Sequence, residues 1–204
     1  MSDSFYKAHP WHGVSIGEDW PQKVNAYIEV VPSDTVKYEL DKETGLLKID
    51  RPQLYSNIYP SLYGMIPRSY CGDRIGKHCQ EMTGQSDIKG DDDPLDICVL
   101  TEKIVPHGDI LLQAKPIGGF RLIDAGEADD KILAVLVNDA SYGSWEDISD
   151  CPEAVIRRLE HFFLTYKQMP GGKDTKCYLA GRYDKEEAFD IIKLSHDDYI
   201  ELFS

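Results

Sequence analysis

The sequence predicts an α+β protein in which a small closed or nearly closed sheet is followed by two C-terminal helices. Two observations predict this class. Short runs of β-type sequence separated by turn residues fill much of residues 24–137, and two segments with helical spacing of apolar residues follow them. Strands followed by helices are typical of α+β folds. With 204 residues, no internal repeat and no linker, we expect one domain, residues 1–204, with a sizeable core.

Each expected strand is a short run in which apolar residues alternate with polar ones or form a buried stretch. In the second run, Val36 and Leu40 point to one face and Lys37 to the other, and residues 41–45 then form a hairpin loop. The expected strands are 24–31, 35–40, 46–51, 95–100, 109–123 and 131–137.

Two stretches are not expected to be regular. Residues 1–23 read as an irregular arm, with two tryptophans and several glycines and prolines. Residues 71–90 are polar, contain four glycines and show no periodicity, so we predict a long loop or insertion there.

Two helices close the chain. The first is expected to begin at Asp150, with Glu153 three residues later in a capping-box arrangement, and to stop at the Pro-Gly-Gly of residues 170–172. The second is expected to begin near Asp184, with Glu187 in the same arrangement. Their apolar faces are Val155, Leu159, Phe162 and Tyr166 in the first helix, and Ala188, Ile191, Ile192 and Tyr199 in the second.

The charge and the cysteines argue against several classes of partner. A formal net charge of −14 disfavours nucleic acid as the main partner and disfavours docking on an anionic membrane. Five cysteines without a CxxC pair fit reduced thiols better than a disulfide framework. Residues 1–13 lack an apolar signal core, and no apolar run of about 18 residues occurs. We therefore expect a cytoplasmic protein without a membrane span.

The most informative feature is an acidic run, Asp91-Asp92-Asp93-Pro94-Leu95-Asp96. Carboxylates this close repel one another and raise each other's pKa, so a pocket holds them only together with cations. Their hard oxygens suit Mg²⁺ or Mn²⁺, and the run lacks the central glycine and distant glutamate of an EF-hand loop. A second acidic stretch, residues 124–131, supplies further carboxylates. The sequence thus predicts a divalent-metal site of the kind that acts on phosphates.

Three other motifs have a simpler structural interpretation. Residues 171–174, Gly-Gly-Lys-Asp, resemble the end of a P-loop, but the upstream glycine is missing and no Ser or Thr follows the lysine, so we expect a helix stop. Cys71, His78 and Cys79 do not have the spacing of a structural zinc site, so we expect loop residues. His161 is expected to pack or to lie at a rim rather than to act in catalysis.

Taken in order, these pieces resemble the soluble family I inorganic pyrophosphatases. The core signature of that family, D-x-D-P-x-D, is met by Asp91, Asp93, Pro94 and Asp96. The further matches are Glu29 in I-E-V-V-P, Lys37-Tyr38-Glu39, Asp50-Arg51-Pro52, Tyr59-Pro60, Tyr63-Gly64, Asp124 with Asp129 and Lys131, and Tyr166-Lys167 after His161-Phe162-Phe163. The resemblance covers residues 24–170, but residues 71–90 have no counterpart in the compact bacterial members.

The resemblance implies a fold, an activity and an assembly. The fold would be a small closed five-stranded OB-like β-barrel with flanking helices, forming a single inorganic pyrophosphatase domain. The activity would be metal-dependent hydrolysis of inorganic pyrophosphate to two phosphates by attack of a metal-bridging water, with several Mg²⁺ ions as cofactor and Mn²⁺ as an alternative. The assembly would be a homo-oligomer, a hexamer as in compact bacterial members or a dimer as in longer eukaryotic ones.

The resemblance also implies a role for each polar site residue. Asp93 would be the general base. The metal ligands would be Asp91, Asp96 and Asp129 for the tighter ions, Asp124 for a further ion, and Glu29 and Glu39 through water. The phosphoryl groups would be held by Lys37, Arg51, Tyr63, Lys131, Tyr166 and Lys167, with Tyr59 supporting the pocket. Asp92 would be a solvated spacer.

The charges of this set predict an order of binding. Seven carboxylates and four cations leave a sum of −3 if all are ionised, so the metal-free site would repel pyrophosphate, whereas two divalent ions bring the sum to +1. We therefore expect metal to precede or accompany the substrate.

Two other functions agree with parts of the sequence. One is a metal-dependent phosphohydrolase acting on a nucleotide or a phosphomonoester, and the absence of a base-stacking platform among the site residues disfavours nucleotides. The other is a small-barrel binding module without catalysis. Such modules bind single strands through basic grooves and exposed aromatic side chains, which a chain of net charge −14 does not favour.

Overall fold

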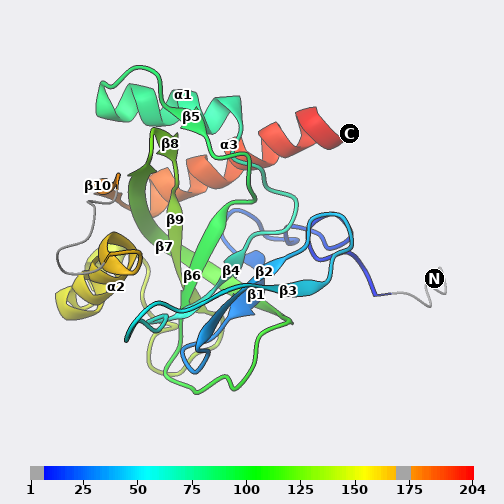
Figure 1. Ribbon diagram of the computed structural model, residues 1–204, viewed down its shortest axis with the longest axis vertical. Coiled ribbons are helices and arrows are strands. Elements are labelled where there is room, and N and C mark those ends of the chain that lie inside the picture. The colour runs from blue at the N-terminus through cyan, green and yellow to red at the C-terminus, as the bar shows by residue number, and fades with distance from the viewer. Residues whose placement is uncertain (1–6, 169–175) are drawn as a thin grey trace.

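The computed structural model describes residues 7–168 and 176–204. In this part of the chain the strands form a mixed eight-stranded sheet and a separate two-stranded hairpin. Figure 1 shows the helices lying outside the curved sheet. The strands of the large sheet are β1 (Val24–Val30), β4 (Leu62–Met65), β5 (Lys89–Gly90), β6 (Asp96–Leu100), β7 (Ile110–Asp124), β8 (Glu127–Ala128), β9 (Lys131–Leu136) and β10 (Cys177–Tyr183).

Five strands of the large sheet pair in a circuit. β1 pairs with β4, β4 with β6, β6 with β9, β9 with β7, and β7 pairs back with β1. Only the pair β6–β9 in this circuit is parallel. The long strand β7 can take part twice because its first residues pair with β1, while its later residues pair with β9 and β10. A mixed sheet with helices around it confirms the α+β class.

The six predicted strands are all present, with ends that differ by at most one residue. They are β1, β2 (Val36–Leu40), β3 (Leu47–Pro52), β6, β7 and β9. The strands β2 and β3 form the separate hairpin, which turns at residues 41–45 as predicted. Strands β4, β5, β8 and β10 were not predicted. Of these, β4 and β10 matter most for the architecture, because β4 closes the gap between β1 and β6, and β10 extends the sheet beside β7.

The loop predicted for residues 71–90 is wrong, because Asp73–Thr83 form helix α1. The helix ends at Gly84, whose φ of +68° is the left-handed conformation that glycine adopts most readily. Its buried residues are Ile75, Gly76 and Cys79. Gly76 lies against the backbone of Gly90, where an added Cβ would be 2.8 Å from the amide nitrogen. A buried face made largely of small side chains does not stand out as an apolar pattern.

Helix α2 (Glu153–Thr165) begins three residues later than predicted, and the capping box lies elsewhere. Asp147 and Asp150 form a capping box around a short 3₁₀ helix, so Asp150 closes that turn instead of starting α2. Pro152 precedes α2 and provides no side-chain cap. Its ring fixes φ at a value that is tolerated at the start of a helix. The predicted stop at residues 170–172 lies outside the described residues.

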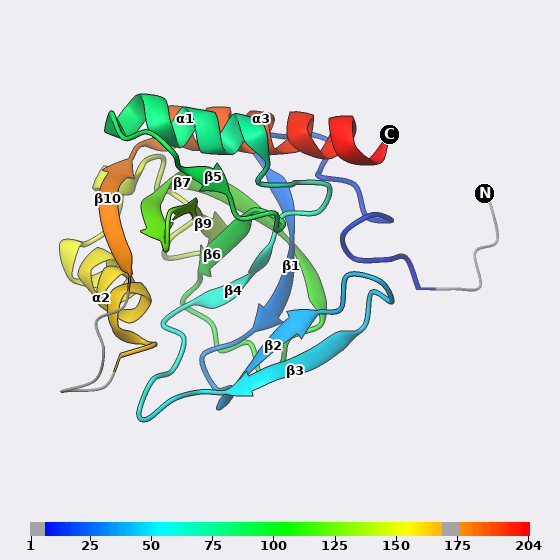
Figure 2. The ribbon, with the colours of Figure 1, turned by 45° about the horizontal axis from the view of Figure 1, so that its top comes forward.

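Helix α3 (Lys185–Phe203) begins as predicted, because the Asp184 side chain accepts a hydrogen bond from the backbone N–H of Glu187 at 3.0 Å. Its predicted apolar face is buried: Ala188, Ile191, Ile192 and Tyr199. Figure 2 shows α3 beside α1 over one end of the sheet, and α3 packs on β7. No helix among the described residues is long and apolar enough to cross a membrane.

Two buried apolar clusters hold the sheet between the helices. One joins the sheet to α1 and α3 and includes Ile132 and Ile191, and the other joins it to α2 and includes Leu133 and Phe162. Ile132 and Leu133 are neighbours in β9, and they serve opposite faces because side chains alternate along a strand. The strand ends that carry the polar site are therefore fixed by packing from both sides.

Candidate active site

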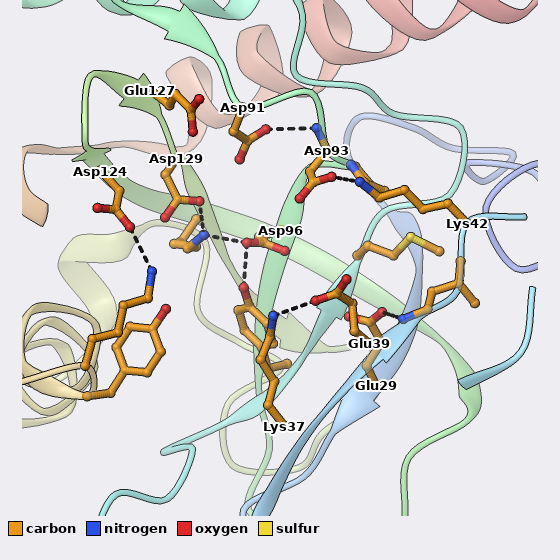
Figure 3. A pocket seen from close by; sticks show the side chains of 17 residues that line it. Glu29, Lys37, Glu39, Lys42, Asp91, Asp93, Asp96, Asp124, Glu127 and Asp129 are labelled. Atoms are coloured by element: carbon orange, nitrogen blue, oxygen red, sulfur yellow. Dashed lines mark hydrogen bonds and ion pairs between the residues drawn. The ribbon is translucent and has the colours of Figure 1, made fainter. Parts of the chain in front are cut away.

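A pocket of about 230 Å³ opens where the hairpin β2–β3 meets the ends of β6, β7 and β9. Figure 3 shows acidic and basic side chains from these elements pointing toward one another. The polar lining residues are Glu29, Lys37, Glu39, Lys42, Tyr63, Asp91, Asp93, Asp96, Asp124, Glu127, Asp129, Lys131, Tyr166 and Lys167. The structure thus brings together every predicted site residue except Arg51 and Tyr59, which do not line the pocket.

The acidic run is shaped by its own turn. The backbone N–H of Asp93 donates a hydrogen bond to Oδ1 of Asp91 at 3.1 Å. Asp92 has a φ of +60°, and its side chain accepts a hydrogen bond from the Tyr70 hydroxyl at 2.5 Å, away from the pocket. Asp91, Asp93 and Asp96 therefore face the pocket, whereas Asp92 is exposed outside it.

Asp91 and Glu29 are pocket carboxylates without an ion pair among the described residues. Burial, with a contribution from Asp129, raises the pKa of Asp91 to about 8. Burial also raises the pKa of Glu29 to about 8, although the Leu40 N–H donates to its Oε1 at 2.6 Å. Burial is the largest cause of both shifts, and Lys131 beside Asp91 and Lys37 beside Glu29 oppose it only in part.

Lys131 bridges two carboxylates at the centre of the site, forming ion pairs with Asp96 and Asp129. The lysine is buried, and burial alone would lower its pKa, but Asp129 and Asp96 raise the pKa well above the ordinary value. The Tyr63 hydroxyl donates to the Oδ2 atom of Asp96 at 2.5 Å. Burial and Asp96 raise the Tyr63 pKa well above its usual value, so this hydroxyl keeps its proton and can donate it.

On the hairpin side, Lys37 lies between two carboxylates. Its Nζ is 2.8 Å from Glu39 and 3.1 Å from Asp50. Burial opposes the charge of Lys37, yet Glu39 and Asp50 raise its pKa above the ordinary value. This side of the pocket therefore holds a permanent cation.

On the opposite side, Lys167 forms an ion pair with Asp124 at 2.8 Å. Its Nζ also lies 5.3 Å from the centre of the Tyr166 ring, and the Arg51 guanidinium lies 5.9 Å from the same ring. Arg51 pairs with Asp50 at 2.5 Å. In this structure Arg51 thus lies beside Tyr166 rather than in the pocket lining.

Tyr59 lies behind the pocket. Its side chain is buried, with its ring centre 4.8 Å from that of Tyr63 and 4.6 Å from that of Phe162. These contacts hold the Tyr63 ring in place.

The donor set fits divalent ions, although the ions have to displace lysines. Within the described ranges, no three acidic, histidine or cysteine side chains are arranged to hold one ion as they stand. The reason is visible in Figure 3, where lysines bridge or cover the carboxylates of Asp96, Asp129 and Asp124. Asp91 is free of such a pair, and its hard oxygens are the kind that Mg²⁺ and Mn²⁺ prefer.

Two polar lining residues were not assigned a role from the sequence, Lys42 and Glu127. Glu127 lies in the second acidic stretch, where its charge is a usable signal. Lys42 lies in the hairpin turn, and nothing in a single sequence distinguishes it from a solvated turn lysine. His161 is exposed on α2 and does not line the pocket. Cys71 lies just before α1 and His78 and Cys79 lie within it, so the expectation of loop residues holds only for Cys71.

The chain matches the family model described as inorganic pyrophosphatase over residues 26–200. It is 55% identical over 199 residues to the inorganic pyrophosphatase of Chlamydia muridarum, a match that covers 96% of this chain and 95% of that protein. It is 36% identical over 194 residues to soluble inorganic pyrophosphatase 1 of Arabidopsis thaliana, covering 95% of this chain and 81% of the other.

Solved structures agree with the sequence matches. The inorganic pyrophosphatase of Thermus thermophilus superposes with a TM-score of 0.78 at 26% identity, covering 95% of this chain and 99% of that one. The type I inorganic pyrophosphatase of P. falciparum superposes with a TM-score of 0.82 at 26% identity, covering 98% of this chain and 66% of that one. Fold, motifs and whole-length similarity agree, and the chain belongs to the inorganic pyrophosphatase family.

Proposed function

We propose that the pocket hydrolyses inorganic pyrophosphate to two phosphates with the help of divalent metal ions, Mg²⁺ in the first instance. The observation that carries this proposal is the facing arrangement of two acidic stretches and four lysines in one small pocket. As a member of the family, the chain is a hydrolase of the inorganic diphosphatase type. The residue roles below are our proposal for how this chain performs that reaction.

The metal ligands in this proposal are Asp91, Asp96, Asp124 and Asp129, with Glu29 and Glu39 acting through water. Bound divalent ions would acidify the attacking water and neutralise charge on the attacking and leaving oxygens. The raised pKa of Asp91 and the absence of an ion pair on its side chain, within the described residues, support Asp91 as a ligand that gains most from an ion. Lys131 would turn from its two carboxylates toward the substrate when ions arrive.

Asp93 is the proposed general base. It lines the pocket and its side chain is 51% exposed, so a water molecule can reach it. The carboxylate takes a proton from the attacking water as the new oxygen–phosphorus bond forms and the bridging phosphorus–oxygen bond breaks, which releases two phosphates.

The phosphoryl groups are held by cations and hydroxyls around the pocket. The proposed set is Lys37, Arg51, Tyr63, Lys131, Tyr166 and Lys167, with Tyr59 as a support. A pocket with this many fixed charges stabilises the charge that builds up on phosphate oxygens during transfer. Arg51 would have to move from beside the Tyr166 ring to reach a phosphate, and its side chain is 35% exposed.

The finer description of the fold and setting is also a proposal. The circuit of five paired strands supports a closed, OB-like β-barrel. We propose a cytoplasmic homo-oligomer, a hexamer or a dimer, on the resemblance to the family and on the reduced state expected for the five cysteines. We propose neither nucleic acid nor a membrane as partner.

The test of the proposed function is Asp93→Asn, an isosteric change that removes the proton acceptor. Phosphate release from pyrophosphate with Mg²⁺ should fall by roughly 10²–10⁴-fold, the usual contribution of a general base. ATP and a phosphomonoester should be poor substrates of the wild-type protein. Turnover of Asp93→Asn near that of the wild type would remove Asp93 from this role, and absence of release from pyrophosphate with Mg²⁺ and Mn²⁺ alike would refute the activity.

A further inference from the structure

Lys42 differs from the other pocket lysines in the carboxylate that it contacts. Lys131 and Lys167 pair with proposed metal ligands, and Lys37 pairs with Glu39 and Asp50. Lys42 instead forms an ion pair with Oδ1 of Asp93, across 51 residues of chain. Figure 3 shows this contact at the edge of the pocket. Among the described residues, this is the only ion pair that the Asp93 carboxylate forms.

The turn that carries Lys42 is held in a fixed shape. The Asp41 side chain accepts hydrogen bonds from the backbone N–H of Thr44 at 3.0 Å and from its hydroxyl at 2.8 Å. The backbone N–H of Gly45 donates to the Asp41 carbonyl at 2.8 Å. The backbone at Lys42 is therefore held in a fixed conformation, although 42% of the Lys42 side chain is exposed.

The N-terminal arm clamps the same turn through His9. The Nδ1 atom of His9 accepts hydrogen bonds from the backbone N–H groups of Trp11 at 3.2 Å and of His12 at 3.3 Å, so Nδ1 carries no proton. The Nε2 atom is then the protonated one, and it donates to the Lys42 carbonyl at 3.2 Å. Gly45 touches the same ring closely, because an added Cβ would lie 2.7 Å from the His9 ring.

The arm itself is anchored in the protein. Trp11 is buried, and its indole N–H donates to the carbonyl of Ser69 at 2.7 Å. A continuous set of contacts therefore runs from the buried Trp11 through His9 to Lys42 and ends on the carboxylate of Asp93.

We infer that Lys42 is a positioning residue for this hydrolysis: its ammonium fixes the Asp93 carboxylate by one oxygen, Oδ1, and leaves Oδ2 for the attacking water. The inference rests on the proposed role of Asp93 as base. An ion pair this exposed adds little to folding stability. Under this inference its contribution is to the orientation of the Asp93 carboxylate. Orientation matters because a misplacement of about 1 Å in a catalytic group can cost 10²-fold in rate.

The test compares the full-length variants Lys42→Met and Lys42→Arg by steady-state hydrolysis of pyrophosphate with Mg²⁺. Lys42→Met should lower kcat by roughly 10- to 100-fold and change KM by less than about threefold. Lys42→Arg keeps a cation and should recover most of kcat. A rise in KM with kcat unchanged would make Lys42 a substrate ligand and overturn the positioning role, as would an unchanged kcat.

Lys48→Met is the matched control. Lys48 lies in the same hairpin, and its replacement by Met removes the same charge. Its Nζ lies 3.4 Å from Oδ2 of Asp41 and, in the described part of the chain, forms no ion pair with Asp93. Its kcat should stay near the wild-type value, which separates loss of the Asp93 contact from loss of charge in the hairpin. His9→Ala should lower kcat in the same direction as Lys42→Met but by less, and an unchanged kcat there would remove the arm from the inference.

The double variant Asp93→Asn/Lys42→Met separates this inference from the proposed function. If Lys42 acts through Asp93, the double variant is no slower than Asp93→Asn alone, because coupled residues are not additive. If the kcat losses of the two single variants multiply in the double variant, Lys42 acts independently of Asp93. That result would overturn the positioning role and leave Asp93 as the base. Near-normal turnover of Asp93→Asn alone would instead refute the proposed base, whatever Lys42→Met does.

Discussion

Two neighbouring carboxylates, Asp129 and Asp130, lie in opposite surroundings. Asp129 faces the pocket and forms an ion pair with Lys131. Asp130 is 2% exposed and does not line the pocket, and neither of its oxygens has a hydrogen-bond partner among the described residues. One step along the chain therefore separates an ion-paired carboxylate at the pocket from a buried carboxylate without a hydrogen-bond partner among the described residues.

Asp130 belongs to a rear cluster of polar side chains between the sheet and the helices α1 and α3: Asp130, Arg121, Tyr183, Glu187 and His78. Arg121 forms an ion pair with Glu187, and Nε2 of His78 lies 3.2 Å from the same carboxylate. The Tyr183 hydroxyl is close to Asp130 but lacks the geometry of a hydrogen bond. Burial raises the pKa of Asp130 to about 7, with Arg121 opposing and Asp129 adding to the rise.

The difference shows what keeps an acidic residue charged in this protein. Asp96, Asp124 and Asp129 form ion pairs with lysines at the pocket, where an ion can reach them. Asp130 has neither solvent nor a hydrogen bond among the described residues, and Arg121 only partly opposes the effect of burial on its pKa. We therefore expect the pocket carboxylates to govern metal binding and rate, and the rear cluster to govern stability.

The largest expected effect is on turnover. Asp129→Asn should lower Mg²⁺-dependent hydrolysis by at least about 10³-fold, or roughly 4 kcal/mol of transition-state stabilisation, because a proposed metal ligand is lost. The matched variant Asp130→Asn removes the neighbouring charge and should stay within about threefold of the wild type. Equal losses in the two variants would contradict the separation between the pocket and the rear cluster.

The fold was predictable wherever side-chain pattern alone determines the element. The six predicted strands alternate or are apolar throughout, and α3 carries both its cap at Asp184 and its apolar face. Helix α1 was missed because backbone contact, not side-chain volume, fills part of its buried face. Strand β4 was missed because it has only four residues and includes Gly64, which approaches the backbone of Tyr27 so closely that an added Cβ would lie 1.9 Å from its carbonyl oxygen.

The site was predictable as a set of residues but not as a set of contacts. Family motifs named twelve of the fourteen polar lining residues. They could not indicate that Lys42 reaches Asp93, since that contact depends on how the hairpin β2–β3 lies over the sheet. Nor could they indicate that Asp130 turns inward while Asp129 turns outward, because both sit in one acidic stretch.

The next effect is on stability and depends on pH. The ordinary pKa of an aspartate is 3.8, and in the folded protein that of Asp130 is raised to about 7. As the pH rises above about 4, the unfolded chain loses this proton first, so the wild-type protein loses stability until about pH 7 and no further beyond it. Asp130→Asn cannot ionise and should be more stable at pH 8 by roughly 4 kcal/mol, with the difference vanishing near pH 4.

Urea unfolding of the metal-free proteins between pH 4 and pH 8 measures this difference. Asp129→Asn is the control, because it removes a charge one residue away that is not buried to the same degree. A constant difference between Asp130→Asn and the wild type across this pH range would show that Asp130 is ionised throughout in the folded protein.

The smallest expected effect is the stability gained from metal. An ion that binds only the folded protein stabilises it by about 2.7 kcal/mol at a concentration of 100 times its Kd. The wild type and Asp130→Asn should gain equally from Mg²⁺ at pH 8, and Asp129→Asn should gain less at the same concentration, because only the outward carboxylate belongs to the proposed metal site. Urea midpoints with and without Mg²⁺ give the three gains. If Asp130→Asn lost the gain instead, the rear cluster would be coupled to the metal site through β9, and the two carboxylates would act as one unit despite their opposite surroundings.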